Sequence, residues 1–183
     1  MPGAKPLFVG RFQPFHLGHL DMVRRIVKDH GELLVGIGSA QYSHTRENPF
    51  TAGERYEMVK RALEGDGIQD FHIVPIPDTH VHSIWVSHVV SLVPRFDVVY
   101  TNSPLVVRLF RERGFAVEEL PLHKRDVYSG TAIRKLIYEG GEWMSLLPKE
   151  VAQYILEIDG PQRIRETFRY STPYGTREDH EGV

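Results

Sequence analysis

Apolar residues recur along this chain in two alternating patterns. Short, mostly apolar runs bounded by polar or glycine-containing segments predict strands near positions 7–10, 32–39, 71–76, 96–101 and 115–122. Between them, apolar residues at helical spacing predict helices near 18–29, 52–64, 84–92, 104–113, 131–138 and 148–158. Because strands and helices alternate regularly, we expect an α/β fold: a doubly wound, Rossmann-like parallel sheet of about five strands with C-terminal helices.

Several helix ends carry chemical signals. Thr51 and Glu54 have the spacing of a capping box, Ser103 precedes a proline at a helix start, and Gly114 stands where a helix should end. After position 160 the pattern weakens, and no internal repeat or linker is evident. We therefore expect a single domain over 1–169 and a mobile tail over 170–183, which is rich in polar and turn residues.

The segment GRFQPFHLGH at positions 10–19 joins the first predicted strand to the first predicted helix. A helix start offers free backbone N–H groups and the positive end of the helix dipole, and both favour an anion. His16 and His19 are three residues apart, so they share a helix face and can both reach one polyphosphate. The dipole favours neutral rings that donate N–H bonds, and Gly18 allows a ligand to approach closely. The segment thus predicts a phosphate site.

Two other interpretations of this segment remain open. One histidine could cap the turn while the other packs in the core. A zinc site would need a third ligand, but the next histidine is His30 and the chain has no cysteine.

The segment YSGTAIR at positions 128–134 also stands at a strand-to-helix transition. Ser129 or Thr131 can cap this helix, and Arg134 falls in its first turns. A lone arginine there is usually an ordinary solvated side chain. Together with the first motif, it is better interpreted as a second phosphate-facing helix start, with Arg134 on the distal phosphates.

These motifs resemble a known family. His-x-Gly-His and Ser-Gly-Thr-x-Ile-Arg resemble the signatures of the nucleotidylyltransferase superfamily. The longer first motif, with GSAQ at 38–41 and NPFTAGER at 48–55, resembles the archaeal-type nicotinamide-mononucleotide adenylyltransferases. The resemblance runs from about position 7 to 158. It implies the strand order 3-2-1-4-5, with the nucleotide crossing between strands 1 and 4. The implied reaction is transfer of AMP from ATP to nicotinamide mononucleotide, giving NAD and pyrophosphate.

The chemistry needs no nucleophilic side chain, because the phosphate of the acceptor attacks ATP directly. We expect His19 to favour the α-phosphate in the transition state and Arg134 to stabilise the leaving pyrophosphate. A divalent cation, first of all Mg²⁺, should be held mainly by ATP and water. The expected catalytic residues are His16, His19, Arg134 and Arg11. The expected ATP-binding residues are Gly10, Arg11, His16, Gly18, His19, Ser129, Thr131 and Arg134.

Four residues are candidates for the acceptor: Ser39, Arg46, His82 and Trp85. A lone tryptophan usually packs in the core, but the resemblance implies that Trp85 stacks on the nicotinamide ring. Arg46 is a candidate for the mononucleotide phosphate, although a loop arginine often has no such role. His82 stands where some relatives have an asparagine, which puts side-chain recognition of the amide in doubt.

Composition limits the partners. With 22 basic and 24 acidic residues, the chain has no strong field that would indicate a nucleic-acid partner. No apolar run reaches membrane-spanning length, the N-terminus lacks the apolar core of a signal peptide, and we expect a cytoplasmic protein. The resemblance implies a homo-oligomer, and it suggests that this oligomer is a hexamer. Two alternatives remain: another acceptor, such as pantetheine phosphate or flavin mononucleotide, and a regulatory nucleotide-binding module without turnover.

Overall fold

The computed structural model describes residues 4–120 and 128–170, and its five strands form one parallel sheet in the order β3-β2-β1-β4-β5. The strands are β1 (Pro6–Gly10), β2 (Leu33–Ile37), β3 (Phe71–Pro75), β4 (Val98–Tyr100) and β5 (Ala116–Glu118). β1 pairs with β2 on one side and with β4 on the other, so the order of connection reverses at β1. The doubly wound sheet and the implied strand order are both confirmed.

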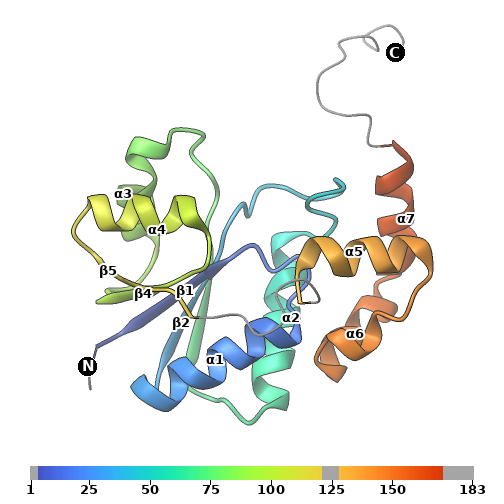
Figure 1. Cartoon of the computed structure of the whole chain (residues 1–183), viewed down its shortest axis with the longest axis horizontal. Helices are drawn as coiled ribbons and strands as arrows, with labels where there is room; N and C mark the ends of the chain where they lie inside the picture. Colours follow the sequence, from blue (N-terminus) through green and yellow to red (C-terminus); the bar gives the residue numbers. More distant parts are fainter. Residues whose placement is uncertain (1–3, 121–127, 171–183) are drawn as a thin grey trace, which may run out of the picture.

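Helices cover both faces of this sheet. They are α1 (Leu17–His30), α2 (Ala52–Gly65), α3 (His82–Leu92), α4 (Pro104–Glu112), α5 (Gly130–Glu139), α6 (Lys149–Glu157) and α7 (Gly160–Tyr170), with a 3-10 turn at Met144–Leu146. Figure 1 shows α3 and α4 together on one side of the sheet and α1 and α2 on the other, with α5, α6 and α7 gathered beside α2.

The alternation of side chains along the strands explains this double cover. In β1, Phe8 belongs to the larger core under α1 and α2, whereas its neighbours Leu7 and Val9 belong to the core under α3 and α4. All three are nearly inaccessible to solvent. Since successive side chains of a strand point to opposite faces, a strand that is apolar at every position has to be buried on both sides. The carboxyl ends of β1 and β4 are therefore fixed between two helical layers.

The predicted capping box of α2 is present. The Thr51 hydroxyl accepts a hydrogen bond from the Glu54 backbone N–H at 3.2 Å, and the Glu54 carboxylate accepts one from the Thr51 N–H at 2.8 Å. Ser103 is the N-cap of α4 but makes no side-chain capping bond.

The last helix, α7, was not predicted. Its buried residues Gly160, Ile164 and Thr167 recur at helical spacing, but only one of them is a large apolar residue. Of the tail expected over 170–183, Tyr170 ends α7 and the other positions lie outside the described residues. Positions 121 and 122 of the predicted fifth strand lie outside them too.

Candidate active site

The start of α1 is organised by a reciprocal bond between its two histidines. Nδ1 of His16, the N-cap residue, accepts a hydrogen bond from the His19 backbone N–H at 3.3 Å. Nδ1 of His19 accepts one from the His16 N–H at 3.2 Å. The two rings are stacked, with their centroids 3.6 Å apart. The pair thus forms a capping box made of imidazoles, in place of the usual serine or threonine with a glutamate.

This capping box fixes the chemical state of both rings. Because each Nδ1 accepts a backbone N–H, the proton of each neutral ring lies on Nε2. Burial lowers the pKa of His16 to about 4, and burial together with the charge of His16 lowers the pKa of His19 well below its usual value. Both rings are therefore neutral Nε2–H donors at neutral pH. The sequence predicts neutral histidine rings from the helix dipole, whereas in the structure burial is the largest cause of their lowered pKa values.

The start of α5 is capped as predicted. The Ser129 hydroxyl accepts a hydrogen bond from the Ala132 N–H at 3.2 Å. Gly130 lies where a Cβ atom would be 2.8 Å from the Gln13 carbonyl oxygen and 3.1 Å from Nη1 of Arg134. A side chain at position 130 would therefore separate α5 from the loop that carries the histidines.

Arg134 is not the solvated side chain that we weighed as an alternative. It is only 6% exposed, and its Nη1 donates to the Gln13 carbonyl oxygen at 2.7 Å, while its Nε donates to the Arg46 carbonyl oxygen at 3.0 Å. Burial, with the nearby charge of Arg11, lowers its pKa to about 10. Among the described residues no carboxylate lies within ion-pair distance of it, and the charge of Glu47 acts on it only from farther away.

Arg46 lies on the same side of the site, against α7. Its guanidinium carbon is 4.5 Å from the centre of the Phe168 ring, and that ring stacks on Tyr138 at 4.6 Å. Arg46 is exposed, so its guanidinium is accessible to an anion. Lys124 and Arg125, which precede the second motif, lie outside the described residues.

A cavity of about 400 Å³ opens at the carboxyl ends of β1 to β4, on the side of α3 and α4. Ligands of doubly wound sheets bind at such a switch point. The lining includes Gly10, Arg11, Ser39, His82 and Trp85, five of the predicted site residues.

Trp85 packs in the core and also lines the cavity. It lies within α3, not in the preceding loop, and its ring meets Phe110 edge to face with centroids 5.7 Å apart. Only 8% of its surface is exposed, and it also lines the cavity. It is therefore a core residue whose remaining surface faces the space where a ligand would bind.

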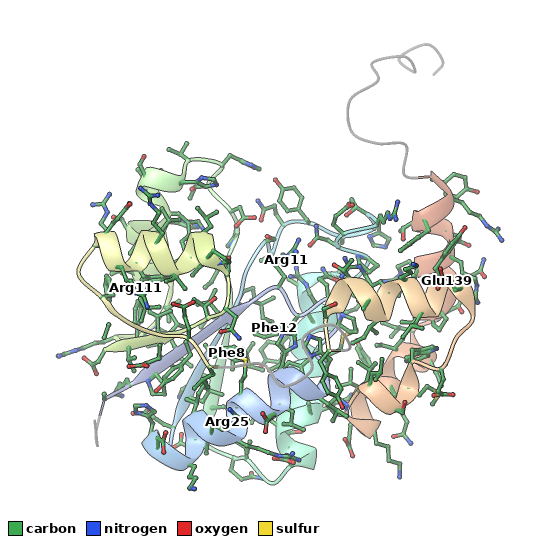
Figure 2. The ribbon with its side chains drawn as sticks, in the orientation of Figure 1. Phe8, Arg11, Phe12, Arg25, Arg111 and Glu139 are labelled. Atoms are coloured by element: carbon green, nitrogen blue, oxygen red, sulfur yellow. The ribbon has the colours of Figure 1, made fainter. Side chains whose placement is uncertain are left out.

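The predicted residues thus fall into two groups around the end of β1. Arg46, His16, His19 and Arg134 are not among the described residues that line the cavity. Arg11 belongs to the cavity and also acts electrostatically on Arg134. Figure 2 shows Arg11 between α4 and α5, above Phe8 and Phe12. It therefore links the cavity to the buried arginine of α5.

Two important residues were not assigned a role in the site from the sequence. Arg55 on α2 is fully buried and donates to the carbonyl oxygens of Arg11, Gly38 and Ser39 at 2.8–3.1 Å, so it joins the ends of β1 and β2. Asp78, after β3, lines the cavity and accepts a hydrogen bond from the Ser39 hydroxyl at 2.7 Å. An arginine in a helix just after a loop, and an aspartate just after a strand, are the signals that could have indicated them.

The described residues contain no group of three histidine, aspartate or glutamate side chains arranged to hold a metal ion. The capping box also leaves the Nε2 proton on each histidine, so neither ring offers a metal its lone pair. None of the helices within the described residues is long and apolar enough to span a membrane.

Comparison with known proteins places this geometry in a family. The cytidylyltransferase-like family matches residues 7–136. The nicotinamide-nucleotide adenylyltransferase of Thermoplasma volcanium is 51% identical over 88% of this chain and 91% of its own length. The enzyme of the same name from Methanolobus tindarius is 49% identical over 93% of this chain and 98% of its own length.

Among solved structures, a bifunctional NMN adenylyltransferase/ADP ribose pyrophosphatase from Francisella tularensis, complexed with AMP and a manganese ion, has a similar fold. Its TM-score is 0.73 at 21% identity. The match covers 91% of this chain and 52% of that protein, so this chain spans about half the length of the bifunctional protein.

Proposed function

The chain belongs to the cytidylyltransferase-like family, and we propose that it transfers AMP from ATP to nicotinamide mononucleotide, giving NAD and pyrophosphate. One observation carries this proposal. Two helix starts, bearing neutral imidazole donors and a buried guanidinium, meet at the end of β1 beside a cavity lined by an indole. The helix starts suit a polyphosphate, and the cavity lined by the indole suits an aromatic base.

The proposed reaction is a direct in-line displacement. An oxygen of the mononucleotide phosphate forms a bond to the α-phosphorus of ATP, and the bond from that phosphorus to the bridging oxygen of pyrophosphate breaks. The Nε2–H of His19 donates to an α-phosphate oxygen and that of His16 binds the triphosphate. Because both rings are already neutral donors, no proton has to be rearranged before the transition state forms. Arg11 and Arg134 stabilise the charge that moves onto pyrophosphate.

Gly10, Gly18, Ser129 and Thr131 complete the proposed ATP site, through close approach of the backbone and through the start of α5. Gly18 supports this role, because a Cβ atom there would lie 3.1 Å from the His16 ring. Ser39, His82 and Trp85 receive the acceptor. Arg46, next to Arg134, binds its phosphate.

A divalent cation enters this proposal as part of the substrate, bound to the phosphates of ATP. The described residues form no cage for it, and the motif residues are donors and cations that bind phosphate oxygens instead. Mg²⁺ is the ion we propose, since it keeps several waters and usually binds through substrate phosphates.

Assembly and location are also part of the proposal. Val81 and Ile84 at the start of α3 and Leu92 at its end are between 41% and 51% exposed. Exposed apolar side chains on one helix support a homo-oligomer, which we propose to be a hexamer in the cytoplasm. Light scattering coupled to gel filtration tests the assembly.

The test of the reaction is incubation of the chain with ATP, Mg²⁺ and nicotinamide mononucleotide, with the products identified by mass. The same assay takes the acid mononucleotide, pantetheine phosphate and flavin mononucleotide as acceptors. NAD and pyrophosphate in equal amounts support the proposal. Turnover with only pantetheine phosphate or only flavin mononucleotide would instead indicate a transferase with a different acceptor. Thermal stabilisation by ATP with no pyrophosphate from any acceptor would indicate a binding module.

A further inference from the structure

The cavity is lined by side chains of opposite charge. Arg11 follows β1 and Asp78 follows β3, and both line the cavity. The two strands are separated by β2 in the sheet, and neighbouring strands lie about 4.8 Å apart. The strands that lead into Arg11 and Asp78 are therefore about 10 Å apart, on the scale of a mononucleotide measured from its phosphate to its base.

The carboxylate of Asp78 is held in place. One of its oxygens accepts the hydrogen bond from the Ser39 hydroxyl. Its backbone N–H donates to the side-chain oxygen of Gln41 at 2.8 Å, and its carbonyl oxygen accepts from the side-chain nitrogen of Gln41 at 3.1 Å. These three bonds fasten the loop after β3 to the loop after β2.

The charge of Asp78 is not neutralised by an ion pair. Over residues 4–120 and 128–170, no lysine, arginine or histidine nitrogen lies within 4.0 Å of its carboxylate oxygens. Asp78 is only half-buried, so water screens it in part, but the cavity is bounded on one side by Trp85 and other low-dielectric side chains. The positive charge of Arg55 acts on Asp78 electrostatically, but Arg55 is fully buried and is not among the residues that line the cavity. The Asp78 carboxylate is therefore the charge that this part of the cavity presents to a ligand.

The amide form of the mononucleotide matches this polarity. Its phosphate is anionic, its pyridinium ring is cationic, and its carboxamide is uncharged. The acid form has the same phosphate and ring but carries an additional carboxylate on the ring. With the phosphate toward Arg11, that carboxylate has to approach the carboxylate of Asp78.

We propose that Asp78 is a specificity-determining residue, whose carboxylate selects the amide mononucleotide over its acid analogue. It attracts the pyridinium ring of both substrates and repels the ring carboxylate of one. This inference rests on the proposed function and names which of two chemically similar acceptors the site favours. His82 lines the same cavity, and its ring nitrogens can hydrogen-bond to either substituent.

The test compares kcat/KM for the amide and acid mononucleotides in the wild-type chain and in Asp78→Asn, which keeps the shape and removes the charge. The ratio of amide to acid should fall two- to thirty-fold. Coulomb's law gives about this range for unit charges about 8 Å apart, between effective dielectric constants of about 80 and about 20. Gln41→Ala is the matched control, because it loosens the same loops without changing the charge. It should lower both efficiencies equally and leave the ratio unchanged.

Salt provides a second measurement that needs no variant. If the field at the ring is negative, screening by added salt should raise the relative efficiency of the acid form in the wild-type chain, and Asp78→Asn should remove most of this effect. An unchanged ratio in Asp78→Asn, an equal change in Gln41→Ala, or a salt effect of opposite sign would overturn the proposal. If the wild-type chain adenylylates neither mononucleotide, the proposed function itself fails.

Discussion

Replacing Arg134 by lysine separates a phosphate-binding role from a purely structural one. The substitution keeps the positive charge and changes only the shape of the donor. Arg134 donates to the carbonyl oxygens of Gln13 and Arg46 from two different nitrogens, which a planar guanidinium presents in a fixed fork. Lysine has a single nitrogen on a flexible stem and cannot reproduce both bonds in that geometry.

The cost in stability follows from these two bonds. Losing one charge-assisted hydrogen bond to a buried carbonyl oxygen costs about 1.5–3 kcal/mol in the free energy of unfolding. Because Arg134 is 6% exposed, solvent screening reduces this cost little. A solvated helix residue would instead change stability by no more than about 0.5 kcal/mol. We therefore expect Arg134→Lys to be less stable by about 1.5–3 kcal/mol while remaining folded.

The kinetic effect is the decisive one. With Nε and Nη1 engaged by the protein, Nη2 remains to face the phosphates, at a weak 3.4 Å contact with the Thr131 hydroxyl. If it binds the leaving pyrophosphate, Arg134→Lys should lower kcat about 10-fold or more in both directions, since the same group must hold pyrophosphate when NAD is cleaved. Steady-state kinetics forward with ATP and in reverse with pyrophosphate measure this effect.

Arg55→Lys provides the matched control. Arg55 is also buried and also donates to carbonyl oxygens, so its replacement should cost similar stability, yet its side chain is fully covered and offers no surface to a phosphate. Pyrophosphate should raise the melting temperature of the wild-type chain and of Arg55→Lys by similar amounts. The increase for Arg134→Lys should be much smaller. If the two variants lose activity and pyrophosphate stabilisation equally, Arg134 has only a structural role and the reasoning is wrong.

Four further predictions concern single side chains. His19→Gln, which keeps an acceptor at the third helical position, should fold and lose about 10²-fold or more in kcat; near-normal turnover would remove His19 from the mechanism. Because burial lowers the pKa of His16 to about 4, the unfolded chain binds the extra proton first, so stability should fall between pH 6.5 and 4. This contribution is about 3 kcal/mol, and His16→Asn, which retains a cap, should flatten the measured slope of unfolding free energy against pH. Trp85→Ala should weaken nicotinamide mononucleotide binding by about 1–3 kcal/mol, with a far smaller change for ATP, whereas equal losses in titration calorimetry would indicate packing alone. Phe168→Leu should raise the KM for the mononucleotide about 2- to 5-fold by removing the aromatic face beneath Arg46, and the KM for ATP should change less. Phe168→Tyr, which keeps an aromatic ring, should leave both KM values near those of the wild-type chain.

Much of the fold was predictable because its elements are locally consistent. The box between Thr51 and Glu54 and the cap at Ser129 depend on residues within one helical turn, and both are present. Ser103 shows the limit of this reasoning, because a residue of the right type stands at the N-cap without making the bond. The strand order could not be derived from periodicity and came from the family resemblance.

The candidate site was less predictable, because its side chains are defined by distant partners. The burial of Arg134 depends on Gln13, 121 positions away, and nothing near Arg134 in the sequence indicates it. Polar and charged residues outnumber the apolar ones in α7, so its pattern is weak, and the helix is stabilised by contacts such as the Arg163–Glu54 ion pair. The two histidines were correctly placed at a helix start, but only coordinates reveal that each caps the other.

The loop between β2 and α2 shows how these distant contacts combine. Gln13 pairs with both the N–H and the carbonyl oxygen of Phe50, Arg134 holds the carbonyl oxygen of Arg46, and Phe168 packs against the Arg46 guanidinium. Three segments far apart in sequence therefore fix this long loop in place. Because Arg134 also donates to the Gln13 carbonyl oxygen, the histidine loop, α5 and the Arg46 loop should become ordered together, in one cooperative step of folding.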